Sequence, residues 1–226
     1  MLSNWALCLN LYCSKTFYFD TKKDIYTHYS DMLRVFICGA HSTGKTTLLK
    51  RFRKLSEPDQ NLSAVNEVAR KIIEKHGWQK KDFDPKIHPD TFYELQLKIL
   101  QEQLRKDEEL CDKNTSYISD RGLDPIIYCK MYLDEDWFQM IMNSIEAKEC
   151  IKRHKAINTT TVVLLPHEEC LQEDGVRLQP KMDELKKFTD LLLNFLEEHD
   201  IKFETIAVLD LDKRVSLLKS FIKAKR

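Results

Sequence analysis

The sequence predicts a doubly wound α/β fold in which five parallel strands form one sheet. From Met32 onward, short apolar or β-branched stretches alternate with longer stretches of helical periodicity, and strands separated by helices form parallel sheets. Hydrophobic residues make up 42% of the 226 residues, which suffices for the core of one α/β domain. No internal repeat or low-complexity linker follows Met32. We therefore expect one domain, residues 32–226, after a short N-terminal extension, residues 1–31.

The extension differs in character from the rest of the chain. It is rich in Tyr, Phe and Asn, lacks helical periodicity and contains neither Gly nor Pro. We interpret it as loosely ordered, because termini often are, with a targeting or interaction arm as the alternative. Its apolar start invites a signal-peptide interpretation, but a basic n-region and a small-residue cleavage site are missing and Asn10 interrupts the apolar run. Secretion is therefore disfavoured.

The first half of the domain begins with a strand and a helix. Residues 35–38 are an apolar run typical of a short buried strand, and the stretch LLKRFRKL within 45–55 has a helical pattern. The helix predicted over residues 89–111 would span on the order of 35 Å. Further strands are predicted over 62–66 and 117–119, and further helices over 67–76 and 89–111.

The second half repeats the alternation. The stretch TTTVVLL, residues 159–165, is β-branched and therefore typical of a strand. A polar loop over 167–179 follows it. Helices are predicted over 125–132, 137–154, 182–199 and 212–223, and the fifth strand over 203–209.

Composition and charge exclude several classes of protein. Lys+Arg and Asp+Glu are 36 each, whereas proteins that bind nucleic acid are usually strongly basic, so nucleic acid is disfavoured as a partner. No apolar run approaches the roughly 20 residues of a transmembrane helix. The seven cysteines are odd in number and form no C-x-x-C pair, so neither a disulfide framework nor a zinc site is predicted. Reduced thiols fit a cytoplasmic protein. No pattern specifies an oligomeric state.

A phosphate-binding loop is the most informative motif. Residues 39–46 read G-x-x-x-x-G-K-T, directly after the first strand and before the first helix. Glycines let backbone N–H groups approach phosphate oxygens, and a helix N-terminus adds partial positive charge. The alternative, a strand–turn–helix corner with an accidental lysine, is much less favoured. The nucleotide-binding residues are predicted to be Gly39, Ala40, His41, Ser42, Thr43, Gly44, Lys45, Thr46 and Thr47.

Within this loop the predicted roles differ. Lys45 would reach the β- and γ-phosphates of ATP, and Thr46 would hold Mg²⁺. GTP is an open alternative to ATP as the nucleotide. His41 is the least expected loop residue, and we interpret it as a spacer in preference to an acid/base group.

A second candidate site follows the second strand. Glu67 and Arg70 belong to the stretch NEVAR, at the sheet edge where open α/β proteins bind ligands. Glu67 could be a catalytic base or a substrate ligand, with Arg70 binding substrate one turn on. Taken alone, E-x-x-R is better explained as an ordinary pair on a helix surface.

A third candidate site follows the third strand, in the stretch SDRGLD. Asp120 would be a Walker-B-like carboxylate that orients Mg²⁺ or its waters, Arg121 would face phosphate or substrate, and Asp124 would bind substrate. A helix-capping aspartate with a solvated arginine explains the first two residues about equally well.

A fourth candidate site lies in the polar loop, in the stretch EDGVR that ends at Arg177. Kinases of this architecture place a mobile lid there, and its arginines act on the transferring phosphate. A plain Asp-Gly turn is the alternative.

Taken together, the motifs resemble the NadR-like P-loop family. VFICGAHSTGKTTLL, NEVAR, HPDTFYELQL, ISDRGLDPIIY and DGVR carry the resemblance, which covers Met32 to about Lys223. The family includes ribosylnicotinamide kinase domains of NAD-salvage proteins and eukaryotic relatives implicated in phosphoinositide and GTP binding. The resemblance implies a five-stranded nucleoside-kinase-like core with ATP and Mg²⁺, and a role in NAD or nucleoside metabolism.

The predicted reaction is transfer of the γ-phosphoryl group from ATP to a small nucleoside-like acceptor. Lys45, Mg²⁺ and Arg177 would neutralise the transferring group, and Glu67 or Asp120 would orient or deprotonate the acceptor hydroxyl. The first rival is a nucleotide-binding regulatory switch, although no N-K-x-D motif is present. The second is an AAA+-type motor, for which the roughly 15 residues after the last strand leave no room for a C-terminal helical domain.

Overall fold

Five parallel strands form one sheet in the computed structural model, which describes residues 32–55, 62–66, 68–170 and 181–225. The strand order is β2-β3-β1-β4-β5, with every pair parallel. The predicted fold class is therefore confirmed. The predicted extension, residues 1–31, lies outside the described residues. The strands are β1 (Arg34–Cys38), β2 (Ser63–Val65), β3 (Tyr117–Asp120), β4 (Thr159–Leu164) and β5 (Phe203–Ile206).

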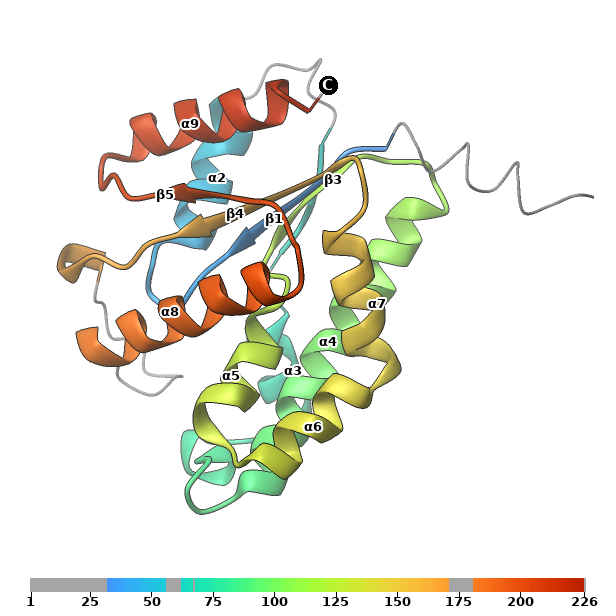
Figure 1. The fold of residues 1–226 in the computed structure, drawn as a ribbon, viewed down its shortest axis with the longest axis vertical. Coiled ribbons are helices and arrows are strands. Elements are labelled where there is room, and N and C mark those ends of the chain that lie inside the picture. Colours follow the sequence, from blue (N-terminus) through green and yellow to red (C-terminus); the bar gives the residue numbers. More distant parts are fainter. Residues whose placement is uncertain (1–31, 56–61, 67, 171–180, 226) are drawn as a thin grey trace, which may run out of the picture.

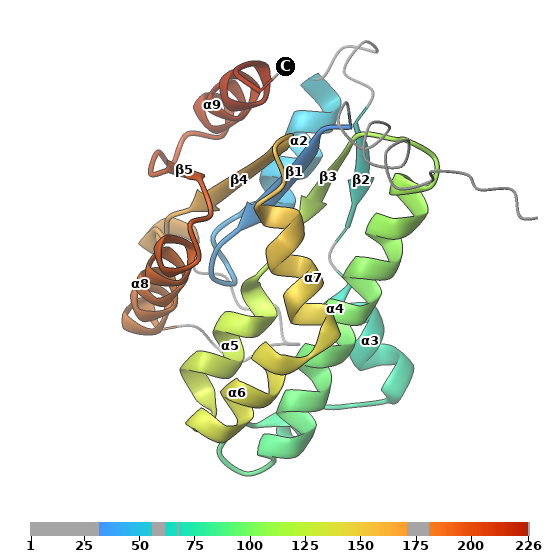
Figure 2. The same ribbon diagram turned by 45° about the vertical axis from the view of Figure 1, so that its right-hand side comes forward.

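Helices cover both faces of this sheet. In Figure 1, α2 and α9 lie on one face, and α4, α5, α7 and α8 lie on the other. Figure 2 shows β2 beside β3 at one edge of the sheet. The helices are α2 (Lys45–Leu55), α3 (Ala69–His76), α4 (Pro89–Cys111), α5 (Asp124–Tyr132), α6 (Glu135–Asn143), α7 (Ile145–His154), α8 (Met182–Glu198) and α9 (Leu211–Lys223), with two short 3-10 helices, η1 (Lys80–Phe83) and η2 (Glu168–Cys170).

The central strand β1 explains why two cores form. Its side chains alternate between the faces of the sheet, as in any strand. Val35 and Ile37 belong to the apolar cluster under α2 and α9, whereas Phe36 and Cys38 belong to the larger cluster under α4, α5, α7 and α8. Burial on both faces is typical of parallel strands and accounts for the continuous apolar run in the sequence.

The single helix predicted over 137–154 is wrong, because the chain forms two helices that meet at Ser144. Ser144 has extended backbone angles (φ −63°, ψ 152°), and its hydroxyl satisfies groups of both helices. Oγ accepts from the N–H of Ala147 at 3.1 Å and donates to the carbonyl of Ile141 at 2.7 Å. Serine is a favoured N-cap, so a local capping signal ended one helix and began the next.

The ends of other elements differ from the predictions by a few residues. β5 ends at Ile206 and not at Leu209, and the helix predicted from residue 67 begins at Ala69. The short helix η1 had not been predicted. Within the described residues, no helix is both long and apolar enough to span a bilayer. Four cysteines of the described residues carry free thiols: Cys38, Cys111, Cys129 and Cys150.

One polar side chain in the core, Asp107 of α4, faces an unfavourable environment. It is buried, with Oδ2 3.4 Å from Nη1 of Arg153 on α7, and Oδ1 has no hydrogen-bond partner among the described residues. Burial raises the pKa of Asp107 to about 7, although the positive charges of Arg153 and Arg34 oppose the shift. The folded state therefore favours the protonated carboxyl group.

Replacement of Asp107 by Asn is expected to flatten the pH dependence of stability. Because the pKa is higher in the folded state than in the unfolded state, wild-type stability falls as pH rises from about 4 to about 7. The cost reaches at most about 4 kcal/mol above pH 8, and D107N should lack it. Urea unfolding at a series of pH values measures this difference. The exposed Asp112 five residues on supplies the control, D112N, and parallel profiles for D107N and wild type would contradict the assignment.

Candidate functional site

The loop predicted to bind phosphate lies at the carboxyl end of β1, at the centre of the sheet. Gly39 has φ 138°, and a Cβ there would lie 2.7 Å from the carbonyl oxygen of Leu164 at the end of β4. Both facts require glycine at this position. Further along the loop Ser42 and Gly44 also have positive φ, 59° and 88°. The tight turn therefore follows directly from the residues of the motif.

A buried arginine from the far end of the chain supports this turn. Arg214, in the first turn of α9, donates through Nη1 to the carbonyl of Thr43 at 2.8 Å and through Nε to the carbonyl of Val208 at 2.6 Å. Thr43 Oγ1 donates to the carbonyl of Ala40 at 2.9 Å. The sequence analysis missed Arg214, because its partner lies 171 positions away and no local pattern marks the contact.

The side chain of Lys45 lies along its own loop. It is 5% exposed, and Nζ donates to the carbonyl oxygens of Gly39 and Ala40 at 2.5 Å each. Asp124 Oδ2 lies 3.7 Å from the same nitrogen. The ammonium group is thus held beside the backbone N–H groups that a phosphate would approach.

Thr46 and Asp120, the two predicted Mg²⁺ ligands, lie within hydrogen-bond distance of each other. Thr46 begins the helix α2 with Lys45, and Asp120 is the last residue of β3. Thr46 Oγ1 donates to Asp120 Oδ2 at 2.5 Å. A hydroxyl and a carboxylate are hard oxygen ligands of the kind that Mg²⁺ prefers, and Mg²⁺ is commonly held by one or two such groups together with substrate phosphates. The donor set fits the ion. Elsewhere in the described residues, no group of three or more His, Cys, Asp or Glu could hold a metal.

Asp124 links three parts of the site. It is fully buried at the start of α5; Oδ1 accepts from the N–H of Gly39 at 3.3 Å, and Oδ2 lies 3.2 Å from Nη1 of Arg121. Burial raises the pKa of Asp124, and the positive charges of Lys45 and Arg121 oppose that shift. These contacts place Asp124 behind the loop, so they favour a positioning role over the substrate contact predicted for it.

Arg121 has the most unusual backbone in the site. Its φ is 107°, a region that costs a residue with a side chain about 1–3 kcal/mol and that clusters at functional sites. Its N–H donates to the carbonyl of Ile37 at 3.1 Å, which extends the β1–β3 ladder by one step. The next residue, Gly122, has no room for a Cβ, because His154 Nε2 would lie 2.4 Å away. The chain therefore turns sharply here and directs Arg121 toward the loop and α5.

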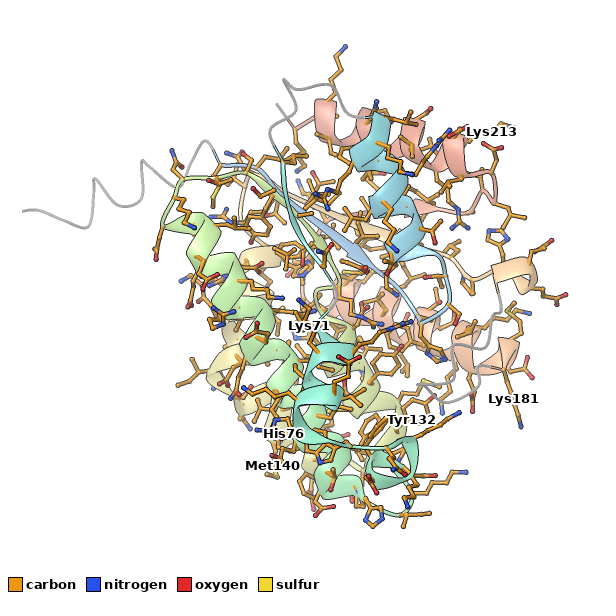
Figure 3. The ribbon with its side chains drawn as sticks, turned by 180° about the vertical axis from the view of Figure 1, so that it is seen from behind. Lys71, His76, Tyr132, Met140, Lys181 and Lys213 are labelled. Carbon is orange, nitrogen blue, oxygen red and sulfur yellow. The ribbon has the colours of Figure 1, made fainter. Side chains whose placement is uncertain are left out.

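An aromatic pocket opens beside the loop. Its cavity volume is about 90 Å³, which is smaller than most small-molecule sites. Its walls come from α3, η1, α4 and α5, and Tyr132, labelled in Figure 3, lies near η1. His41 and Arg121 join the lining from the side of the phosphate loop. The apolar and aromatic lining includes Ile73, Phe83, Phe92, Leu95, Tyr128 and Tyr132.

The sequence analysis did not find this pocket. Its lining residues are dispersed from His41 to Tyr132, and the helical periodicity that marks each one as buried does not distinguish a core from a pocket wall. A possible signal was the row Pro125, Tyr128 and Tyr132, which falls on one face of a helix at spacings of three and four.

The other predicted site residues are placed as follows. Thr47 is exposed in the first turn of α2, and Arg70 is exposed in the first turn of α3. Glu67 and Arg177 lie outside the described residues, so their roles stay predictions. The structure thus brings together Lys45, Thr46, Asp120, Arg121 and Asp124.

Comparison with protein families identifies the chain. A family model for an AAA domain matches residues 34–214, which is most of the sequence and includes every residue of the site described above. The chain belongs to this AAA-domain family. No curated protein matches the sequence.

Solved structures share the fold of this AAA-domain chain at low sequence identity. The NadR protein in complex with NR has a TM-score of 0.62 and 16% identity, over 89% of this chain and 52% of that one. NadR with NAD and AMP-PNP has a TM-score of 0.58 and 14% identity, over 88% and 52%. Deoxyadenosine kinase from M. mycoides with bound dATP has a TM-score of 0.61 and 14% identity, over 84% and 100%. The chain spans about half the length of NadR.

Proposed function

We propose that this chain is a Mg²⁺-dependent kinase that transfers the γ-phosphoryl group of ATP to a hydroxyl of a nucleoside-like molecule. The observation that carries the proposal is the aromatic pocket that opens against the phosphate loop, with His41 and Arg121 at the boundary. A protein that only binds and hydrolyses a nucleotide has no need of a second ligand pocket there. The likeness to NadR and deoxyadenosine kinase supports this interpretation.

In this proposal the residues of the chain act mainly by positioning and by neutralising charge. Lys45 moves from the carbonyls of its loop to the β- and γ-phosphates, and the exposed N-terminus of α2 binds phosphate oxygens through its N–H groups. Thr46 and Asp120 hold Mg²⁺, which supplies charge neutralisation at the phosphates when it is bound. Arg121 directs its guanidinium group to the transferring phosphoryl group or to the acceptor.

Deprotonation of the acceptor hydroxyl requires a carboxylate that accepts its proton. Glu67 is the predicted base, and Asp120 is the alternative within the described residues. Arg177 is the predicted lid arginine, and Arg70 is a predicted substrate ligand. In this proposal Asp124 contacts Lys45, Arg121 and the N–H of Gly39 and so fixes their positions relative to one another.

The class of acceptor follows from the walls of the pocket. Phe83, Phe92, Tyr128 and Tyr132 supply ring faces and edges against which a flat heterocycle can stack. The phosphate-proximal end is polar, so the hydroxyl-bearing part of the acceptor would point there. A ribosylated base satisfies both requirements, and nicotinamide riboside is the first member of that class to test, which would place the reaction in NAD salvage.

The proposal is tested by measuring ADP release with Mg·ATP and a panel of acceptors. The panel contains nicotinamide riboside, deoxyadenosine, other nucleosides and shikimate as a non-nucleoside alcohol. We expect turnover to rise at least tenfold with one or more nucleosides over the rate without acceptor, and not with shikimate. Tight nucleotide binding with no acceptor-stimulated turnover would favour the regulatory switch instead.

A further inference from the structure

Helix α5 contacts the phosphate loop through two residues one turn apart. Asp124 accepts the N–H of Gly39 at 3.3 Å, and the hydroxyl of Tyr128 accepts the N–H of His41 at 3.0 Å. Residues four positions apart lie on the same face of a helix. The same face continues to Tyr132, which lines the aromatic pocket together with Tyr128. One rigid helix face therefore contacts both the nucleotide loop and the proposed acceptor pocket.

The Tyr128 hydroxyl has three polar partners. It accepts the N–H of His41 at 3.0 Å and also interacts with the side chain of Arg121. A third contact joins the hydroxyl oxygen to His41 Nδ1 at 3.0 Å.

Aromatic neighbours contact part of the Tyr128 ring. The ring of Tyr128 lies 4.5 Å from that of Phe188 on α8 and stacks on Tyr132 at 6.2 Å, with 13° between the planes. One side of the ring lines the pocket. A ligand that packs against the ring would thus bear directly on a group bonded to the phosphate loop and to Arg121.

We infer that Tyr128 is a positioning residue that couples acceptor binding to nucleotide binding, an inference that rests on the proposed kinase function. A ligand that orders the Tyr128 ring also orders the N–H of His41 and the guanidinium of Arg121. The second ligand then meets a loop that is already ordered, so each ligand raises the affinity of the other by the same factor. This role differs from the spacer function that the sequence suggested for His41.

The test replaces Tyr128 by Phe, which keeps the ring and removes all three hydrogen bonds. AMP-PNP with Mg²⁺ is titrated by calorimetry into the full chain, with and without saturating nicotinamide riboside or deoxyadenosine. We expect the acceptor to raise AMP-PNP affinity at least fivefold in wild type. In Y128F this factor should fall to about one, although each ligand still binds. Y93F is the control, because it removes a hydroxyl from Tyr93 of α4, which packs against Trp137 and is not among the residues that line the pocket, and it should keep the wild-type factor.

Steady-state kinetics supply a second readout. Because the ring surface is retained, Y128F should change the KM of the acceptor less than about threefold, whereas kcat should fall at least tenfold through misplacement of the loop and Arg121. A purely structural role would lower the thermal midpoint without this separation of kcat from KM. If Y128F does not fold, His41→Ala, which removes the Nδ1 contact and keeps the backbone contact, should reduce the coupling factor at least twofold.

Several results would overturn the inference. The first is a wild-type coupling factor near one for both acceptors, and the second is a Y128F factor equal to that of wild type. The others are an equal loss in Y93F, or an unchanged factor in His41→Ala where that variant has to be used. Other results distinguish failure of the kinase proposal from failure of the coupling. Coupled binding that depends on Tyr128 but gives no phosphorylated product would refute the kinase and leave the coupling in place, whereas turnover with unchanged coupling in Y128F would do the reverse.

Discussion

Replacement of Lys45 by methionine is expected to lower phosphoryl transfer about 10³-fold, which is the size of effect seen when one donor to a developing charge is lost. Nζ of Lys45 is held 2.5 Å from two loop carbonyls and 3.7 Å from Asp124. The ammonium group therefore lies next to the loop N–H groups that a phosphate would approach. Methionine keeps the length of the side chain and removes its charge. The measurements are ADP release and the rise in thermal midpoint that Mg·ATP produces.

The K45M experiment must distinguish loss of nucleotide binding from loss of folding stability. Lys45 is buried, and its charge compensates Asp124, so the variant without ligand should itself melt at a lower temperature. The informative quantity is therefore the increment that nucleotide adds, which should vanish in K45M. The exposed Lys50 on the same helix gives the control, K50M, with a wild-type increment. A full increment in K45M would refute the phosphate-loop assignment.

Replacement of Asp120 by asparagine is expected to reduce turnover about 10²-fold and to remove most of the effect of Mg²⁺ on nucleotide affinity. Asp120 Oδ2 accepts the Thr46 hydroxyl at 2.5 Å, and the amide is a weaker ligand for a hard cation than the carboxylate. Titration with ATP should be measured with and without Mg²⁺ in both proteins. Without the ion, D120N should bind ATP at least as well as wild type, because one negative charge near the phosphates is gone.

Asp212 provides the comparison for this variant. It is an exposed carboxylate on α9 paired with Arg51, so D212N changes the net charge equally and should leave the dependence on Mg²⁺ intact. An equal response of D120N and wild type to Mg²⁺ would remove Asp120 from the metal site.

Much of the fold could be predicted from local patterns in the sequence. The apolar run of β1, the β-branched run of β4 and the long periodic stretch of α4 each specify one element, because burial and periodicity are properties of neighbouring residues. The break at Ser144 was missed although its cause is local, since the apolar periodicity continues across it and hides the capping serine.

The edge of the sheet that carries the candidate site was predicted for a similar reason. The loop around Lys45 carries its own backbone requirements, and Asp120 follows a recognisable strand. Parallel strands end at a common edge, so topology alone brought Thr46 and Asp120 together across 74 positions. The sequence therefore determined the fold class, the family and the meeting of Thr46 with Asp120.

Only the tertiary structure decided which side chains support that centre. The bond from Tyr128 to the His41 N–H spans 87 positions, and the bond from Arg214 to Thr43 spans 171. Such contacts depend on where whole helices pack against the sheet, and no periodicity or motif encodes the distance between two particular atoms. The aromatic pocket arises in the same way, because a pocket is the space that several packed elements leave between them.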